Sequence, residues 1–149
     1  MAAPIASADE FSTAWEAFFR ATRRARGRST GTLEGTRLSL AQYQLLEALR
    51  ATPRLPMAEL AASAGVAPPT ATRMLDALVR DGLAVRTPCT DDRRVVHIAL
   101  TDAGREAVAE AAERVAAGRA RVRDQLTPAE QEQAATLLRR LAGIVEEQL

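Results

Sequence analysis

Threonine and arginine side chains gather in two short segments of this chain, and their chemistry suits the binding of phosphate and base edges. Thr70, Thr72 and Arg73 lie within four residues, and an Asp-Arg-Arg triplet occupies residues 92–94. A threonine hydroxyl bonds base edges or phosphate, and a guanidinium grips guanine through two hydrogen bonds. An arginine on a narrow hairpin tip can enter the minor groove, where A-tracts enhance the negative potential. Both segments therefore predict contacts with double-stranded DNA, if the fold presents them on elements that a groove admits.

Two helical patterns separated by a tight turn precede the charged triplet. Residues 57–64 predict a short helix, which Gly65 ends because glycine tolerates the left-handed conformation that such turns often need. Pro68 and Pro69 fit the first turn of a new helix, where the N–H that proline lacks has no partner anyway. That helix continues over residues 70–80 and carries Thr70, Thr72 and Arg73.

Two strand-like runs flank the triplet. Residues 83–87 follow Gly82, and residues 95–100 alternate between two faces with the period of two that is typical of a strand. Two helices, a turn and two strands around a charged tip are the order of a winged helix-turn-helix. The predicted fold class is therefore mainly α with a small β-hairpin wing.

The helix over 70–80 has a core side and an outer side. At helical spacing, the core side comprises Ala71, Met74, Leu75, Leu78 and Val79. Threonines, arginines and one aspartate, Asp76, project from the remaining surface. Taken alone, this helix would suit an all-α bundle with solvated polar residues, and the triplet would suit a solvent-exposed turn. The helix and the triplet together favour DNA recognition over these two alternatives.

The order and identity of these residues resemble the multiple antibiotic resistance regulator (MarR) family of bacterial transcription factors. The match is strongest along the wing, where Asp92-Arg93-Arg94 precedes the strand at 95–100 and then Thr101-Asp102-Ala103-Gly104. Leu60-Ala61, Thr70-Ala71-Thr72-Arg73 and the run from Leu78 to Leu83 agree as well. The resemblance extends over almost the whole chain.

This resemblance implies a sequence-specific transcriptional regulator, a repressor, that binds a near-palindromic operator as a homodimer. Two-fold symmetry then requires half-sites one helical turn apart. The implied DNA contacts are Pro68, Thr70, Ala71, Thr72, Arg73, Asp92, Arg93 and Arg94. In the family pattern Arg94 enters the minor groove, Arg93 contacts phosphate, and Asp92 orients Arg94 or a neighbouring arginine.

The segments before and after this region carry one-sided apolar faces and capping-box patterns, at Ser7–Glu10, Ser39–Gln42 and Thr127–Glu130. The N-terminal face comprises Phe11, Trp15, Phe18 and Phe19, and the C-terminal face comprises Leu137, Leu138, Leu141, Ile144 and Val145. By resemblance, the chain is one domain, 1–149, in which dimerisation helices at 1–37 and 102–149 flank a DNA-binding region at 38–101. The alternative is a monomer that packs both faces onto its central region.

The resemblance also implies a small effector, often aromatic or phenolic, that binds where the dimerisation and DNA-binding regions meet and weakens operator binding. The candidate wall of its pocket comprises Trp15, Phe18, Phe19 and Tyr43. The same four residues would also serve as ordinary core.

Charge leaves a second interpretation open. The net charge of the chain is +1, and residues 57–100 carry five arginines against five acidic residues. Because DNA-binding domains are usually basic, DNA binding requires that Arg73, Arg93 and Arg94 face phosphate while the acids lie elsewhere. Without that segregation, the chain would be a helical interaction protein that binds another regulator and not DNA.

Other classes find little support in the composition. One cysteine, Cys89, and one histidine, His97, form no ligand cluster, so neither a metal nor another cofactor is predicted. No motif pairs a nucleophile with a base, which argues against an enzyme. No apolar run approaches the roughly 20 residues that span a bilayer, and the N-terminus lacks a signal-peptide pattern. We therefore expect a cytoplasmic, nucleoid-associated protein without a membrane partner.

Overall fold

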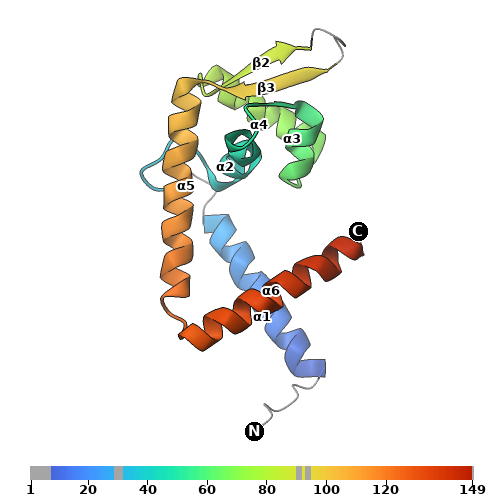
Figure 1. Cartoon of the computed structure of the whole chain (residues 1–149), viewed down its shortest axis with the longest axis vertical. Coiled ribbons are helices and arrows are strands. Elements are labelled where there is room, and N and C mark those ends of the chain that lie inside the picture. Colours follow the sequence, from blue (N-terminus) through green and yellow to red (C-terminus); the bar gives the residue numbers. More distant parts are fainter. Residues whose placement is uncertain (1–7, 29–31, 90–91, 93–94, 149) are drawn as a thin grey trace. The chain divides into compact units, whose positions relative to one another are not determined.

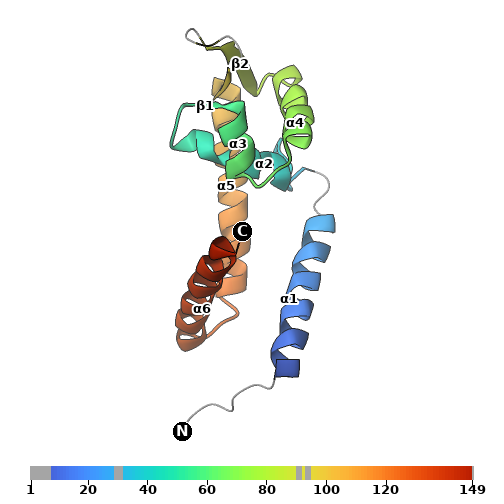
Figure 2. The same cartoon turned by 90° about the vertical axis from the view of Figure 1, so that its right-hand side faces the viewer.

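A computed structural model describes residues 8–28, 32–89, 92 and 95–148 (Figures 1 and 2). The chain divides into two compact units, residues 1–111 and 112–149. The elements are α1 (Ala8–Arg28), α2 (Leu40–Leu46), a 3-10 helix (Glu47–Arg50), β1 (Arg54–Pro56), α3 (Met57–Ser63), α4 (Pro68–Arg80), β2 (Ala84–Pro88), β3 (Val96–Leu100), α5 (Asp102–Arg123) and α6 (Pro128–Glu147). Among the helices of the described ranges, none has the length and apolar character needed to cross a membrane.

The predicted fold class is confirmed, and the sheet is larger than predicted by one strand. Its three antiparallel strands run in the order β1-β3-β2, and Ile98 of β3 lies opposite Leu55 on one side and Arg86 on the other. Sequence patterns miss β1 because it has only three residues and ends in a proline. Proline lacks the N–H for a ladder bond and is tolerated here because β1 is an edge strand.

The helix-turn-helix forms where the residue pattern predicts it. Gly65 adopts φ 61° after α3, and the N–H of Val66 donates to the carbonyl oxygen of Ala61 at 3.0 Å, which closes the turn. Pro68 and Pro69 occupy the first positions of α4. Gly82, with φ 72°, then leads the chain away from the end of α4 into β2. Glycine is needed at both turns because an L side chain is strained at such φ values.

One apolar core holds these elements. Side chains from α2, α3, α4, the sheet and the start of α5 contribute to it, and the largest fully buried ones are Leu38, Leu45, Leu46, Leu60, Leu75, Leu78, Leu83, Ile98 and Val108. Burial of a leucine or isoleucine side chain contributes about 1.5–3 kcal/mol. Because α4 places Leu75 and Leu78 in this core, its opposite side faces outward.

Two capping boxes are confirmed at the starts of α2 and α6. Ser39 and Gln42 exchange hydrogen bonds between side chain and backbone, and so do Thr127 and Glu130. Hydrogen bonds from the backbone N–H and the hydroxyl group of Thr127 lower the pKa of Glu130 below its usual value of 4.5. The third predicted box begins at Ser7, which lies outside the described residues.

The apolar faces of α1 and α6 are open to solvent in the single chain. Phe11 and Phe18 of α1 are more than half exposed, and so are Leu137 and Leu138 of α6. The aromatic rings of α1 contact one another in tilted and edge-on arrangements, with 4.7 Å between the centroids of Trp15 and Phe19. No described residue of α6 is buried.

Candidate nucleic-acid interface

The outer face of α4 presents the first polar cluster to solvent. Thr70, Thr72 and Arg73 are all exposed. The Thr72 hydroxyl donates to the carbonyl oxygen of Pro68 at 2.9 Å, and Nε of Arg73 donates to the carbonyl oxygen of Pro69 at 3.4 Å. Both bonds lie within the first turns of the same helix. The two side chains are thus anchored locally and accessible from outside.

Two other predicted contacts on α4 have different surroundings. Pro68 is exposed at the first position of the helix. Ala71 is fully buried, with an exposed fraction of 0%, and packs on the core side. The prediction of Ala71 as a DNA contact is therefore wrong, because its methyl group has no accessible surface. Helical periodicity already places Ala71 on the core side.

The wing is a regular antiparallel hairpin. Five residue pairs join β2 to β3, from Ala84 opposite Leu100 to Pro88 opposite Val96. The N–H of Cys89 donates to the carbonyl oxygen of Val95 at 2.8 Å, and this bond extends the hairpin by one step.

At the tip, Asp92 is half-buried, and its carbonyl oxygen accepts from the N–H of Val95 at 2.9 Å. Arg93 and Arg94 lie outside the described residues, so their roles at the DNA remain predictions. His97 is half-buried on β3 opposite Thr87. The described part of the chain contains no group of three or more histidine, cysteine or acidic side chains placed to hold a metal.

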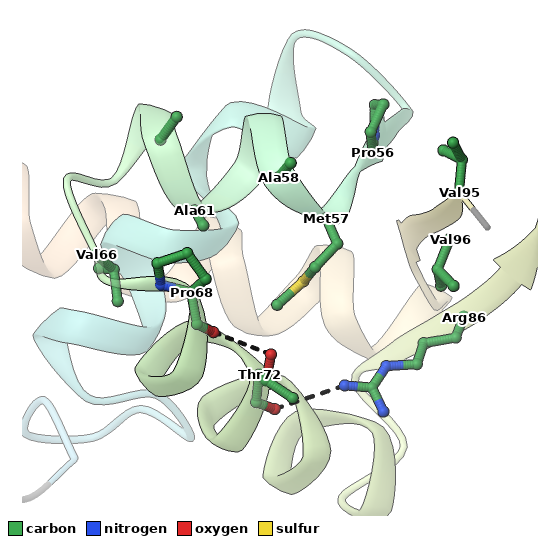
Figure 3. A pocket seen from close by; sticks show the side chains of 11 residues that line it. Pro56, Met57, Ala58, Ala61, Val66, Pro68, Thr72, Arg86, Val95 and Val96 are labelled. Atoms are coloured by element: carbon green, nitrogen blue, oxygen red, sulfur yellow. Dashed lines mark hydrogen bonds between the residues drawn. The ribbon is translucent and has the colours of Figure 1, made fainter.

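An ion pair ties the wing to α4 beside the polar cluster. Nη1 of Arg86, on β2, lies 2.6 Å from Oδ1 of Asp76. Nη2 of Arg86 donates to the carbonyl oxygen of Thr72 at 3.5 Å, as Figure 3 shows. Asp76 shares the outer surface of α4 with Arg73, so the expected separation of acids from that arginine fails at this position. The guanidinium of Arg86, from β2, neutralises the charge of Asp76 instead.

A cavity of about 790 Å³ lies between α3, α4 and the wing (Figure 3). Its walls are mostly apolar side chains, among them Met57, Val66 and Val96, and its polar groups come from Thr72 and Arg86. Sequence reasoning missed this cavity because its walls come from three separate segments with no common motif. The size is within the range that accommodates small organic ligands.

The four residues predicted to form an effector pocket do not line this cavity. Trp15, Phe18 and Phe19 lie on the exposed face of α1. Tyr43 has an exposed fraction of 3%, and its hydroxyl donates to Oε1 of Glu47 at 2.7 Å. Burial is the main cause that raises the pKa of Tyr43, and the bond to Glu47 adds to it. Tyr43 therefore lies in the apolar core, and its part in an effector pocket stays a prediction.

The base of the wing is fixed to the start of α5. The N–H of Thr101 donates to the carbonyl oxygen of Leu83 at 3.1 Å, and the Thr101 hydroxyl donates to the carbonyl oxygen of Gly82 at 2.7 Å. The same hydroxyl accepts from the N–H of Gly104 at 2.9 Å. A Cβ atom at Gly104 would overlap with the carbonyl oxygen of Leu83 and lie 2.9 Å from its carbon. This geometry explains the Thr-x-x-Gly pattern after β3.

Comparison with known proteins agrees with this architecture. A sequence profile described as MarR family matches residues 38–96, from the start of the α2 region to the first residue of β3. Over 80 residues the chain is 36% identical to an uncharacterized HTH-type transcriptional regulator, YhbI, of Bacillus subtilis strain 168. That match covers 54% of this chain and spans about half, 52%, of the relative.

Solved structures match over nearly the full length. The YusO protein of Bacillus subtilis is 31% identical, with a TM-score of 0.64, over 93% of this chain and 99% of its own. The transcriptional repressor CouR, solved bound to a 23-mer DNA duplex, is 29% identical, with a TM-score of 0.77, over 94% of this chain and 99% of its own.

Proposed function

Because the chain belongs to the MarR family, we propose that it is a sequence-specific DNA-binding transcriptional regulator, and not an enzyme, that represses transcription as a homodimer. The observation that carries the proposal is the outer face of α4, where Thr70, Thr72 and Arg73 are exposed while Leu75 and Leu78 hold the helix in the core. The major groove of DNA admits a helix with such a face. The DNA duplex in the CouR structure supports the same kind of ligand for this chain.

In this proposal Thr70, Thr72 and Arg73 contact base edges and phosphate. Pro68 stands at the N-terminal end of α4, where the partial positive charge of the helix favours an approaching phosphate. In the same proposal Arg93 and Arg94, which follow Asp92 in the sequence, also contact the duplex. Base contacts then specify the operator, and phosphate contacts position the protein.

We expect Arg73→Ala to weaken binding to the operator by about 10- to 100-fold, because a guanidinium that grips a base or phosphate contributes roughly 1–3 kcal/mol. The operator would be selected by the wild-type protein from a random duplex library. Fluorescence anisotropy of that labelled duplex at several salt concentrations measures the affinity. The salt slope should fall along with the affinity if Arg73 contacts phosphate.

Arg139→Ala is the matched control, since it removes an exposed arginine from α6 and should leave the affinity unchanged. Equal affinity of the Arg73→Ala protein and the wild type would remove Arg73 from the interface. A wild-type protein that selects no duplex would instead favour the alternative, a helical protein that binds another regulator.

The open apolar faces support the homodimer. Large side chains of α1 and α6 are exposed over contiguous helical faces, and soluble proteins rarely leave such patches uncovered. We propose that a second copy covers both faces. The two copies of α4 in the dimer would then contact the two halves of a near-palindromic operator.

The cavity beside α4 supports regulation by a small ligand. Its apolar wall suits an aromatic ring, and the N–H groups of Arg86 that are not bonded to Asp76 and Thr72 can donate to a carboxylate. We propose that an aromatic or phenolic acid binds there. Because Thr72 belongs both to the cavity wall and to the outer face of α4, occupancy would compete with DNA binding.

We expect at least one compound of an aromatic acid library to raise the melting temperature of the wild-type protein and to release the selected duplex. A ligand at 100 times its Kd stabilises the protein that it binds by about 2.7 kcal/mol. Ala62→Phe, which adds a ring at an exposed residue of the cavity wall, should abolish this shift while the protein still binds DNA. An undiminished shift in Ala62→Phe would place the ligand elsewhere.

A further inference from the structure

We propose that Arg86 is a positioning residue for DNA binding, because it neutralises Asp76 and so leaves Arg73 available to the duplex. The inference rests on the proposed function. It also answers a question that composition raises, namely how a segment with as many acids as arginines can present a cationic face.

Asp76 lies on the outer face of α4, beside Thr72 and Arg73. It lies four residues after Thr72 and three after Arg73, and residues at these spacings share one face of a helix. The Asp76 side chain is 53% exposed. A duplex bound through Thr72 and Arg73 would therefore approach this carboxylate closely. A carboxylate without a counter-ion at that place would repel the phosphates.

Two arginines of α4 itself could compete with Arg86 for Asp76. Arg73 and Arg80 lie three residues before it and four residues after it, at the spacings that favour ion pairs within a helix. Within the described ranges neither of them forms a salt bridge with Asp76; Arg86 does, at 2.6 Å. If Arg86 were removed, Asp76 would draw Arg73 or Arg80 along the helix surface. The loss of Arg86 would thus both expose an acid and withdraw an arginine.

The geometry of Arg86 is fixed by its place in the sheet and by its two acceptors on α4. Its backbone pairs with Ile98 in the wing sheet, and Ile98 is fully buried. Its guanidinium reaches two acceptors one turn apart on α4, the Asp76 carboxylate and the carbonyl oxygen of Thr72. A planar guanidinium holds two acceptors at once, which limits the entropy lost per bond. The pair is therefore positioned before DNA arrives.

The test compares four proteins on the duplex that the wild type selects from a random library. We expect Arg86→Gln to weaken binding by about tenfold or more at low salt, since each 1.4 kcal/mol of like-charge repulsion is a factor of ten. The deficit should shrink as salt rises, because salt screens exposed charges. Asp76→Asn should bind at least as tightly as the wild type. The double variant Arg86→Gln/Asp76→Asn should recover most of the lost affinity.

Rescue by the double variant separates charge cancellation from two other roles. If Arg86 contacts DNA directly, or if its bonds only brace the wing against α4, the double variant will bind as weakly as Arg86→Gln. That result, or an Arg86→Gln protein with unchanged affinity, would overturn the inference while the proposed function stands. A wild-type protein that selects no duplex would overturn both.

Arg123→Gln is the matched control, because it also breaks an exposed arginine–aspartate pair, with Asp124 at 2.8 Å, and removes one positive charge. It should bind like the wild type. Circular dichroism melting of all variants checks that they fold. If Arg123→Gln weakened binding as much as Arg86→Gln does, the loss of affinity would come from the change in net charge alone. That result would contradict the specific role of Arg86.

Discussion

Gly104→Ala is expected to lower the free energy of unfolding by about 3 kcal/mol, at the upper end of the range for overpacking a tight site. The added methyl group would overlap with the backbone carbonyl oxygen of Leu83. A backbone atom cannot rotate away as the end of a flexible side chain can. Relief would require α5 to move from the base of the wing, which would strain the three hydrogen bonds around Thr101. Urea unfolding at a fixed protein concentration measures the change.

Gly118→Ala is the matched control on the same helix. A Cβ atom there would meet no heavy atom within 4 Å, and φ lies outside the region that requires glycine. Alanine at this position should stabilise the protein by about 0.5–1 kcal/mol, because it restricts the unfolded chain and favours the helix. If both variants changed stability alike, the close approach of Gly104 to Leu83 would not exist in solution.

Leu138→Glu should convert the protein to a monomer and weaken operator binding by about 100-fold or more, because two linked half-site contacts gain 10²–10⁴ in avidity over one. Leu138 is 57% exposed, so the fold of the single chain does not depend on its burial. In a two-fold interface each substitution occurs twice, and each copy buries an unpaired carboxylate. Light scattering after size exclusion gives the mass, and anisotropy on the selected duplex gives the affinity.

Ala135→Glu is the control for this variant. Ala135 is also exposed on α6 but lies away from the apolar face, so the same glutamate should leave both mass and affinity unchanged. A Leu138→Glu protein that remained dimeric with full affinity would show that α6 does not contribute to the interface.

Sequence reasoning succeeded where a structure depends on neighbouring residues. Gly65, Gly82 and the Pro68-Pro69 pair define their turns within a few positions, and two of the capping boxes form as the spacing of their polar residues predicts. Core and outer faces of α4 follow its helical period. The assignment of Ala71 to the DNA contacts followed the family resemblance, although the helical period places Ala71 on the core side. The burial of its side chain contradicts that assignment.

Features that depend on distant residues were not predictable in this way. The cavity joins three segments, and the pairing of Arg86 with Asp76 joins a strand to a helix across ten positions. Neither pattern leaves a periodic signal in the sequence. The short strand β1 was missed for a related reason, because its pairing with β3 over a long separation creates it and its own three residues do not.

The attachment of Arg86 to α4 limits how the protein can change its target in evolution or by design. One side chain of the wing contacts the carboxylate of Asp76 and the backbone of Thr72, so the wing and the outer face of α4 are not independent modules. Grafting the outer face of a relative's helix onto this scaffold would transfer its specificity only if the residue that faces Arg86 were transferred too. New operators are therefore reached most directly through Thr70 and Arg73, which can vary without disturbing that contact.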